Sequence, residues 1–331
     1  MANDHEVVVI TGASAGVGRA TARHFAERGA WLGLIARGED GLDATKLDVE
    51  SRGARAITLP LDVSDSEAVD AAAQRVEQEF GPIDVWINNA MVSVFSPIKE
   101  MKAEEYRRVT EVTYLGYVNG TLAALRRMHP RDRGAIVQVS SALAFRGIPL
   151  QSAYCGAKHA IDGFTDALRC ELIHDGSHVR VSEVHLPAMN TPQFSWVKSR
   201  LPNQPQPVPP IYQPEIAARA IYWAAHHKRR GVLVGWPTVA SIYANKVFPG
   251  VLDWYLGKQG YKSQQTQEPV TPGRSDNLWE PVPGDHGAHG DFGDQSLKQS
   301  WQLKASLHRA QLVAGGALLG VGIFFATKAK N

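Results

Sequence analysis

The chain has 331 residues, of which 44% are hydrophobic and 21% charged, a balance typical of globular proteins that bury a core. Its 35 Lys and Arg residues against 33 Asp and Glu residues give a formal net charge of +2. Because no long run of Lys and Arg is present to neutralise a row of phosphates, the composition argues against nucleic acid as a partner.

The chain starts with a short polar stretch, Met1–Glu6, which does not have the form of a signal peptide. From there to about Gly235, short apolar runs alternate with longer helical stretches such as Ala20–Arg28 and Pro214–His226. The apolar runs are Val7–Ile10, Trp31–Ala36, Ala56–Leu59, Val85–Ile87, Ile136–Val139, Val179–Val184 and Val232–Val234. Continuous apolar runs favour strands buried on both faces of a parallel sheet, and the stretches between them are long enough for right-handed crossovers. The pattern predicts a doubly wound α/β domain over residues 1–257.

Three segments depart from this alternation. Prolines crowd residues 187–213, which predicts a long loop that covers or lines a binding site. Residues 258–295 are polar and rich in Gln, Gly, Pro and Asp, which predicts an extended or disordered linker. Residues 296–331 are expected to form a C-terminal helix, and the run Leu312–Ala326 within them carries no charge.

Residues 11–18 read Thr-Gly-Ala-Ser-Ala-Gly-Val-Gly and lie between the first predicted strand and the first predicted helix. Glycines let a backbone turn tightly and approach a pyrophosphate, and the N–H groups at a helix N-terminus attract the anion. This position predicts a dinucleotide-binding loop, with contacts from Gly12, Ser14, Gly16, Val17 and Gly18. Its spacing is Gly-x-x-x-Gly-x-Gly rather than the common Gly-x-Gly-x-x-Gly.

Arg37 follows the second apolar run. In dinucleotide folds an acidic residue near this place holds the ribose 2′-hydroxyl of NAD, whereas an arginine accommodates the 2′-phosphate of NADP. Because a guanidinium matches a phosphate well, Arg37 predicts NADP(H) as the cofactor. The alternative is an arginine that is simply solvated at the end of a strand.

Tyr154 and Lys158 are four residues apart, which on a helix places both side chains on one face. A neighbouring ammonium favours tyrosinate and lowers a phenol pKa that starts near ~10, as a general acid/base near neutral pH requires. Ser140 and Ser141 end the apolar run Ile136–Val139, at the edge of the sheet where ligands bind in this fold.

Together these motifs resemble the short-chain dehydrogenase/reductase family over about Glu6 to Val234, which implies a Rossmann-like fold and an oxidoreductase acting on a carbonyl or an alcohol. The family places its catalytic serine thirteen residues before its tyrosine, which selects Ser141. The resemblance implies that Tyr154 exchanges a proton with the substrate oxygen, that Ser141 binds this oxygen, and that Lys158 holds the nicotinamide ribose. It also implies cofactor contacts from Asp62, Val63, Asn89, Ala90, Pro187 and Thr191, and a homo-oligomer.

Three positions depart from the family pattern. Met91 stands where the Asn-Asn-Ala-Gly segment has its glycine, and Ala188 stands where Pro-Gly is common. Thr113 replaces the asparagine to which the family's proton relay is credited. These departures leave open a second function, a nucleotide-binding scaffold or redox sensor without turnover. A nucleotide-sugar epimerase is a third reading, which the composition of the C-terminal extension disfavours.

The substrate is expected to be a lipophilic carbonyl or alcohol, because the proline-rich loop carries apolar side chains. These are Met189, Phe194, Trp196, Leu201, Ile211 and Tyr212. The uncharged run Leu312–Ala326 predicts an anchor on the cytoplasmic side of a membrane, with Gly316 and Gly320 suited to close helix packing. A helix packed on the protein or on a second subunit, in a soluble cytoplasmic enzyme, is the rival reading.

Two further sets of side chains are not assigned a site. Cys155 and Cys170 fall on one predicted helix, roughly 22 Å apart, too far for a disulfide, and they favour a reducing compartment. Asp285, His286, His289, Asp291 and Asp294 cluster in the predicted linker, where glycines surround them and no rigid frame holds them, so no metal is expected.

Overall fold

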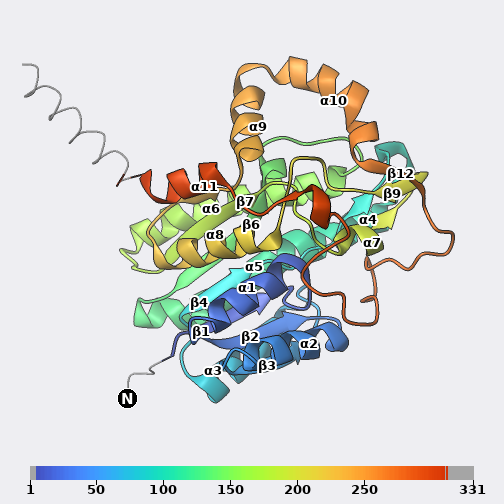
Figure 1. Cartoon of the computed structure of the whole chain (residues 1–331). Coiled ribbons are helices and arrows are strands. Elements are labelled where there is room, and N and C mark those ends of the chain that lie inside the picture. The colour runs from blue at the N-terminus through green and yellow to red at the C-terminus, as the bar shows by residue number, and fades with distance from the viewer. Residues whose placement is uncertain (1–4, 310, 312–331) are drawn as a thin grey trace, which may run out of the picture.

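The computed structural model describes residues 5–309 and residue 311. Seven parallel strands form one sheet in the order β11-β7-β6-β4-β1-β2-β3 (Figure 1). They are β1 (Val7–Thr11), β2 (Trp31–Ala36), β3 (Ala56–Pro60), β4 (Val85–Asn88), β6 (Ala135–Ser141), β7 (Arg180–Leu186) and β11 (Gly231–Leu233). Each contains or overlaps one of the predicted apolar runs, so the predicted Rossmann-like α/β fold is confirmed.

Helices cover both faces of the sheet (Figure 1). The apolar side chains of α1 (Gly16–Ala26), α2 (Glu39–Glu50) and α8 (Pro214–His226) share one core with the strands. Those of α3 (Ser66–Phe80), α5 (Gly116–Met128) and α6 (Ser152–His174) share the other. Strand order reverses between β1 and β4, which places a crevice at the carboxyl ends of these strands, where ligands bind in such folds.

Shorter elements connect the layers. Before α6 these are β5 (Val94–Phe95), η1 (Ile98–Glu100), α4 (Ala103–Thr110), the π-helical turn η2 (Glu111–Leu115), η3 (His129–Arg131) and η4 (Ala142–Ala144). The proline-rich loop contains α7 (Gln193–Trp196), β8 (Lys198–Ser199), β9 (Asn203–Pro205) and β10 (Ile211–Tyr212). Cys155 and Cys170 both lie on α6, as the sequence predicted. Cys155 is buried, Cys170 is exposed, and neither forms a disulfide.

Two helices, α9 (Trp236–Val247) and α10 (Pro249–Ser263), rise above the sheet domain (Figure 1). After them β12 (Gln265–Pro269) pairs antiparallel with β9, and the chain runs back across the domain to η5 (Gly293–Gln295), β13 (Ser296–Leu297) and α11 (Trp301–Leu307). Residues 258–295 are therefore not a free linker. Their first part completes α10, and Leu278 and Ala288 are buried in the cores of the sheet domain, which supplies the apolar contacts that a disordered segment lacks.

The expected C-terminal helix falls mostly outside the described residues, which include only α11 and its immediate continuation. The uncharged run Leu312–Ala326, with Gly316 and Gly320, lies wholly outside them. Among the residues that the structure describes, no helix is both long and apolar enough to cross a membrane.

Candidate active site

The loop between β1 and α1 has the backbone that its glycines were expected to allow. Gly12 and Gly16 adopt left-handed φ angles of 65° and 56°, which side chains with a Cβ disfavour. A Cβ on Gly18 would collide with the carbonyl oxygen of Gly12. The loop is held from behind by Asn89, whose Nδ2 donates to the carbonyl oxygens of Thr11 (3.0 Å) and Gly12 (3.2 Å).

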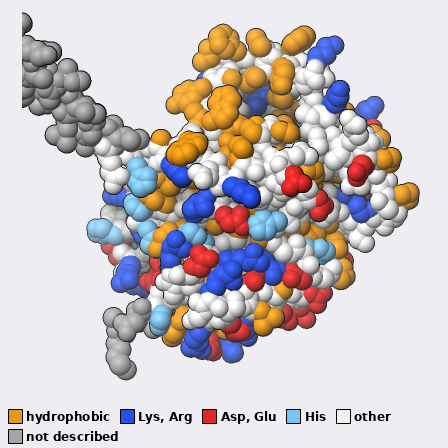
Figure 2. Space-filling view, in the orientation of Figure 1, with side chains coloured by type: hydrophobic (Ala, Val, Ile, Leu, Met, Phe, Trp, Pro, Cys, Tyr) orange, Lys and Arg blue, Asp and Glu red, His pale blue; other side chains and the backbone are white. Residues whose placement is uncertain are grey.

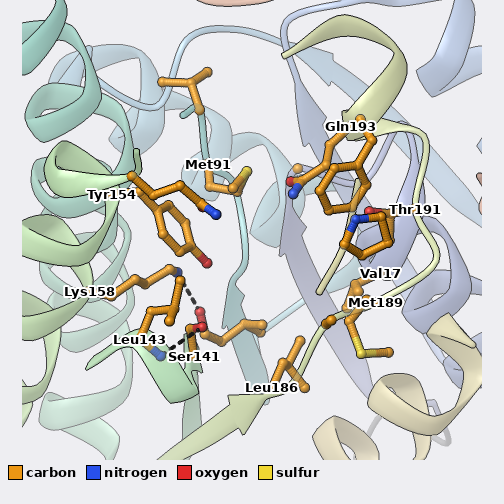
Figure 3. A pocket seen from close by; sticks show the side chains of 18 of the residues that line it. Val17, Met91, Ser141, Leu143, Tyr154, Lys158, Leu186, Met189, Thr191 and Gln193 are labelled. Atoms are coloured by element: carbon orange, nitrogen blue, oxygen red, sulfur yellow. Dashed lines mark hydrogen bonds between the residues drawn. The ribbon is translucent and has the colours of Figure 1, made fainter. Parts of the chain in front are cut away.

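A cavity of about 550 Å³ runs from this loop to the carboxyl end of β6. Its lining brings together all three predicted catalytic side chains, Ser141, Tyr154 and Lys158. It also includes the predicted cofactor residues Gly12, Ser14, Gly16, Val17, Arg37, Asp62, Val63, Asn89, Ala90, Pro187 and Thr191. Of the predicted set only Gly18 does not face it, because this glycine lies against the loop itself. Figure 3 shows Ser141, Tyr154 and Lys158 on one side of the cavity and Met189, Thr191 and Gln193 on the other.

Lys158 is fully buried, and burial lowers the pKa of its ammonium to about 7, an effect that the carboxylate of Asp162 opposes. Its Nζ donates to the carbonyl oxygen of Val139 (2.8 Å) and to the hydroxyl of Tyr117 (3.0 Å). Tyr117 in turn donates to the same Val139 carbonyl (2.8 Å). Tyr117 and Val139 thus both bind the Lys158 ammonium. The sequence did not predict a role for Tyr117, because a tyrosine inside an apolar helix gives no signal of its own.

Tyr154 reaches the cavity from the first turn of α6. Burial raises the pKa of Tyr154 above its ordinary value, and a hydrogen bond with Ser141 works in the opposite direction. The nitrogen of Lys158 lies 5.5 Å from the centre of the Tyr154 ring. The expected lowering of the Tyr154 pKa by Lys158 stays a prediction, since burial is the largest influence on this phenol here.

Thr113, at the position of the family's relay asparagine, lies in the π-helical turn that joins α4 to α5. Its hydroxyl donates to the carbonyl oxygen of Val92 (2.9 Å) and accepts from the Val92 N–H (3.0 Å). The side chain therefore fastens the segment after β4 to the helix. One turn later on the same helical run, Tyr117 reaches the lysine instead.

Arg37 directly follows β2 and lines the cavity, but its guanidinium binds main-chain oxygens from a distant segment. One nitrogen donates to Trp279 O (2.7 Å) and the other to Asn277 O. Arg108 binds the same segment through Leu278 O (3.0 Å) and forms an ion pair with Asp62. Asp62, predicted to contact adenine, also accepts from Ser64, so its carboxylate is largely engaged by protein groups.

We call residues 276–290 the strap, because they cross the end of the cavity that the glycine loop lines. At its far end Gly287 O accepts from the N–H of Gly16 (3.1 Å), and Asp285 forms an ion pair with Arg19. The N–H of Gly284 donates to Asp40 (2.7 Å). Strap residues Asn277, Pro281, Val282, Gly284 and His286 line the cavity. The predicted linker is thus one wall of the site, which its composition did not indicate.

Many of the side chains that line the cavity are apolar. They include Met91, Val92, Leu143, Ile148, Leu186, Met189, Phe194, Trp196, Leu252 and Leu256. Three apolar residues of the proline-rich loop do not line the cavity. Leu201 packs with Phe95 and Leu150, while Ile211 and Tyr212 are buried away from the cavity.

Two groups of potential metal ligands include side chains that bind other protein groups. In the strap, Asp285 pairs with Arg19, and His289 pairs with Glu215 (2.7 Å). The second group is Asp162 of α6 with Glu183 and His185 of β7, whose ligand atoms lie within 4.8 Å of one another. There Ser140 donates to Asp162 (3.0 Å) and Arg169 to Glu183 (2.6 Å), and burial with the nearby Asp162 raises the pKa of Glu183 to about 8. Because Ser140 and Arg169 already bind two of these three side chains, we assign the cluster no metal.

The family model described as short chain dehydrogenase matches residues 6–200. An uncharacterised oxidoreductase of Bacillus subtilis, YxnA, is 32% identical over 98% of this chain and 90% of its own. The crystal structure of levodione reductase shares 27% identity with a TM-score of 0.62, covering 71% of this chain and 98% of that one. A short chain dehydrogenase from Mycobacterium paratuberculosis, solved bound to NAD, shares the fold with a TM-score of 0.60 at 24% identity, covering 69% and 96%.

Proposed function

Because the chain belongs to the short-chain dehydrogenase family, we propose that this oxidoreductase interconverts a carbonyl and an alcohol on a lipophilic small molecule, with NADP(H) as its preferred cofactor. The observation that carries the proposal is the single cavity that Ser141, Tyr154 and Lys158 share with the glycine loop. The many apolar side chains that line this cavity support the substrate class. A homo-oligomer is part of the proposal, because members of the family often associate.

The residues of the cavity fit a dinucleotide. The loop of Gly12 and Gly16 turns without side chains, as the close approach of a pyrophosphate requires, and the cavity continues from there to Tyr154. Arg37, Asp62 and Val63 would hold the adenosine end, and Asn89, Lys158 and Thr191 the nicotinamide end. When bound, the nicotinamide supplies or accepts the hydride.

The protein's own groups would handle the proton and the position of the substrate. The Ser141 hydroxyl donates to the reacting oxygen, and the phenol of Tyr154 gives this oxygen a proton in reduction or takes one in oxidation. Lys158, held by Tyr117 and Val139, supplies positive charge next to that phenol. The apolar side chains around the cavity exclude water from the reaction.

Preference for NADP(H) rests on Arg37. It is a basic side chain at the end of β2, lines the cavity, and presents the planar donor group that suits a 2′-phosphate. Its present bonds go to neutral carbonyl oxygens of the strap, which a dianionic phosphate can replace with a stronger, charge-assisted interaction.

The test is oxidation of NADPH and of NADH with a panel of hydrophobic aldehydes and ketones, by wild type and by Tyr154→Phe. We expect turnover with NADPH that the substitution abolishes, while NADPH fluorescence still reports binding. Binding without turnover in the wild type would favour the scaffold or sensor, the reading that Thr113 keeps open.

A further inference from the structure

The outer surfaces of α9 and α10 carry large apolar side chains that the described part of the chain leaves exposed. These are Trp236, Tyr243, Val247, Phe248, Val251, Trp254, Tyr255 and Tyr261, each between 46% and 68% exposed. Figure 2 shows hydrophobic side chains gathered over these two helices. We call this set the aromatic face. A contiguous apolar surface of this kind on a water-soluble domain marks a binding surface.

Helix α10 has apolar side chains on its inner side as well as on its outer side. Leu252 and Leu256 of α10 turn toward the cavity, and Gly260 packs on Pro149, so the inner side of the helix is satisfied within the protein. The aromatic face is a second apolar side of the same helix. A helix that is apolar on opposite sides requires a partner on each.

The charges beside the aromatic face favour an anionic partner. Lys246, Lys258 and Lys262 are exposed on the two helices. Asp253, the acidic residue among them, forms an ion pair with Arg146 (2.6 Å). A two-fold pairing of two copies through this face would bring both sets of lysines into one interface, because such an interface places the same patch on both subunits. Anionic lipid headgroups instead attract each lysine.

The residue types of the aromatic face also favour a lipid bilayer as the partner. Trp and Tyr concentrate where proteins meet the boundary of a bilayer, since their rings are apolar and their N–H or O–H groups remain near water. The aromatic face has two Trp and three Tyr side chains. In addition, α11 lies beside the start of α9, where Gln302 Nε2 donates to Leu233 O (3.1 Å), and the sequence beyond it continues into the uncharged run Leu312–Ala326. The sequence therefore contains a second apolar segment after α11.

We propose that the aromatic face docks on the surface of an anionic lipid bilayer and that the cavity receives its substrate from that side. Tyr255 belongs both to the exposed face and to the cavity lining, which makes α10 the border between them. A lipophilic carbonyl compound dissolved in the bilayer then reaches Tyr154 without crossing water. The docking itself stands alone, whereas the substrate route rests on the function proposed above.

The first test is hydrogen exchange by mass spectrometry on the full chain, with and without vesicles. Vesicles of phosphatidylcholine with a quarter phosphatidylglycerol should slow exchange in α9 and α10 by several-fold, and vesicles of phosphatidylcholine alone should slow it less. This readout locates the contact, so it distinguishes docking through these helices from attachment through residues 312–331 alone.

The second test is co-sedimentation of full-length variants with the same vesicles. Phe248→Glu/Trp254→Glu removes two exposed rings that do not line the cavity, and its vesicle affinity should fall at least about ten-fold, the effect of leaving even one large apolar side chain unburied. Ile173→Glu, at a side chain 79% exposed on α6, is the matched control and should bind as wild type does.

Three results would overturn the proposal. Unchanged exchange in α9 and α10 with anionic vesicles would exclude docking there. Protection of these helices that rises with protein concentration without lipid, together with a dimer in sedimentation velocity, would assign the face to a second copy. Equal vesicle affinity of the double variant and wild type would show that the rings do not insert. Reduction of a water-soluble aldehyde should be the same in the double variant, so a failure of docking is distinguishable from a failure of the proposed enzyme function.

Discussion

Tyr117 is the residue whose removal tests the active site most sharply. Tyr117→Phe deletes one oxygen, which accepts from Lys158 at 3.0 Å and donates to Val139 O at 2.8 Å. The ring itself keeps its buried place beside the lysine nitrogen. The change is therefore nearly free of packing effects, and its consequences report on the ammonium.

The magnitude follows from the kind of bond that is lost. A hydrogen bond to a charged group contributes about 1.5–3 kcal/mol, and a factor of ten corresponds to ~1.4 kcal/mol. Because Val139 O still accepts from Lys158, we expect the lower end, roughly a ten-fold fall in kcat/KM at pH 6.

The pKa of Lys158 predicts in which direction the pH profile of kcat/KM should move. Burial lowers the pKa of Lys158 to about 7, so the ammonium is present below that pH and is lost as pH rises through it. Removing an acceptor destabilises the charged form further and lowers this pKa again. The alkaline limb of kcat/KM should therefore move to lower pH in Tyr117→Phe. The assay is initial rates of NADPH oxidation from pH 5 to pH 9 at several substrate concentrations.

Tyr106→Phe is the matched control, because Tyr106 also bonds to α6, through Ser152 Oγ at 2.6 Å, without contacting Lys158. Its alkaline limb should stay where the wild type has it. If Tyr117→Phe leaves the limb in place, or if both variants move it equally, Tyr117 does not position the lysine.

Arg37→Ser should raise KM for NADPH about ten-fold or more and leave KM for NADH within a few-fold, since only the phosphate loses its charge-assisted bonds; steady-state kinetics with both cofactors decide this. Asp285→Asn should loosen the strap over Gly16 and raise the NADPH dissociation rate several-fold in stopped-flow fluorescence, whereas Asp70→Asn, which weakens a distant pair with Arg127, should not. Glu183, with its pKa raised from 4.5 to about 8, keeps a proton in the folded chain that the unfolded chain releases, so stability should fall as pH rises from about 4.5 to 8. Glu183→Gln should flatten that slope in urea unfolding; an unchanged slope would assign the raised pKa to another group.

The sheet was predictable because its strands are buried on both faces. Runs such as Trp31–Ala36 are apolar without interruption, and the structure places β2 over the same residues. The candidate catalytic residues could be predicted for a different reason. The four-residue spacing of Tyr154 and Lys158 fixes their common face on any helix. The end of an apolar run indicates Ser140 and Ser141, and the thirteen-residue spacing of the family selects Ser141. Each of these signals is local in the sequence.

What could not be predicted depends on contacts between distant residues. The strap is polar and rich in glycine, like a solvated linker, but it is ordered by Arg37 and Arg108, which lie at least 170 positions earlier in the chain. Its bonds to Arg37 come from backbone carbonyl oxygens, which every residue has, so no side-chain pattern announces them. Tyr117 is similar, since its partner Lys158 is 41 residues away.

The strap also changes what Arg37 means for the choice of cofactor. A bare guanidinium at the end of β2 would select NADP(H) by attraction alone, but here the same donors already satisfy Asn277 O and Trp279 O. A 2′-phosphate therefore gains only the difference between a charge-assisted bond and the bonds it replaces, and the strap must give up part of its attachment when the phosphate binds. NADH, without that phosphate, leaves Arg37 on the strap. Preference between the two cofactors is thus linked to how firmly Arg108, Arg19 and Gly16 hold the strap once Arg37 has exchanged partners, so substitutions at the distant Asp285 should alter NADPH binding more than NADH binding.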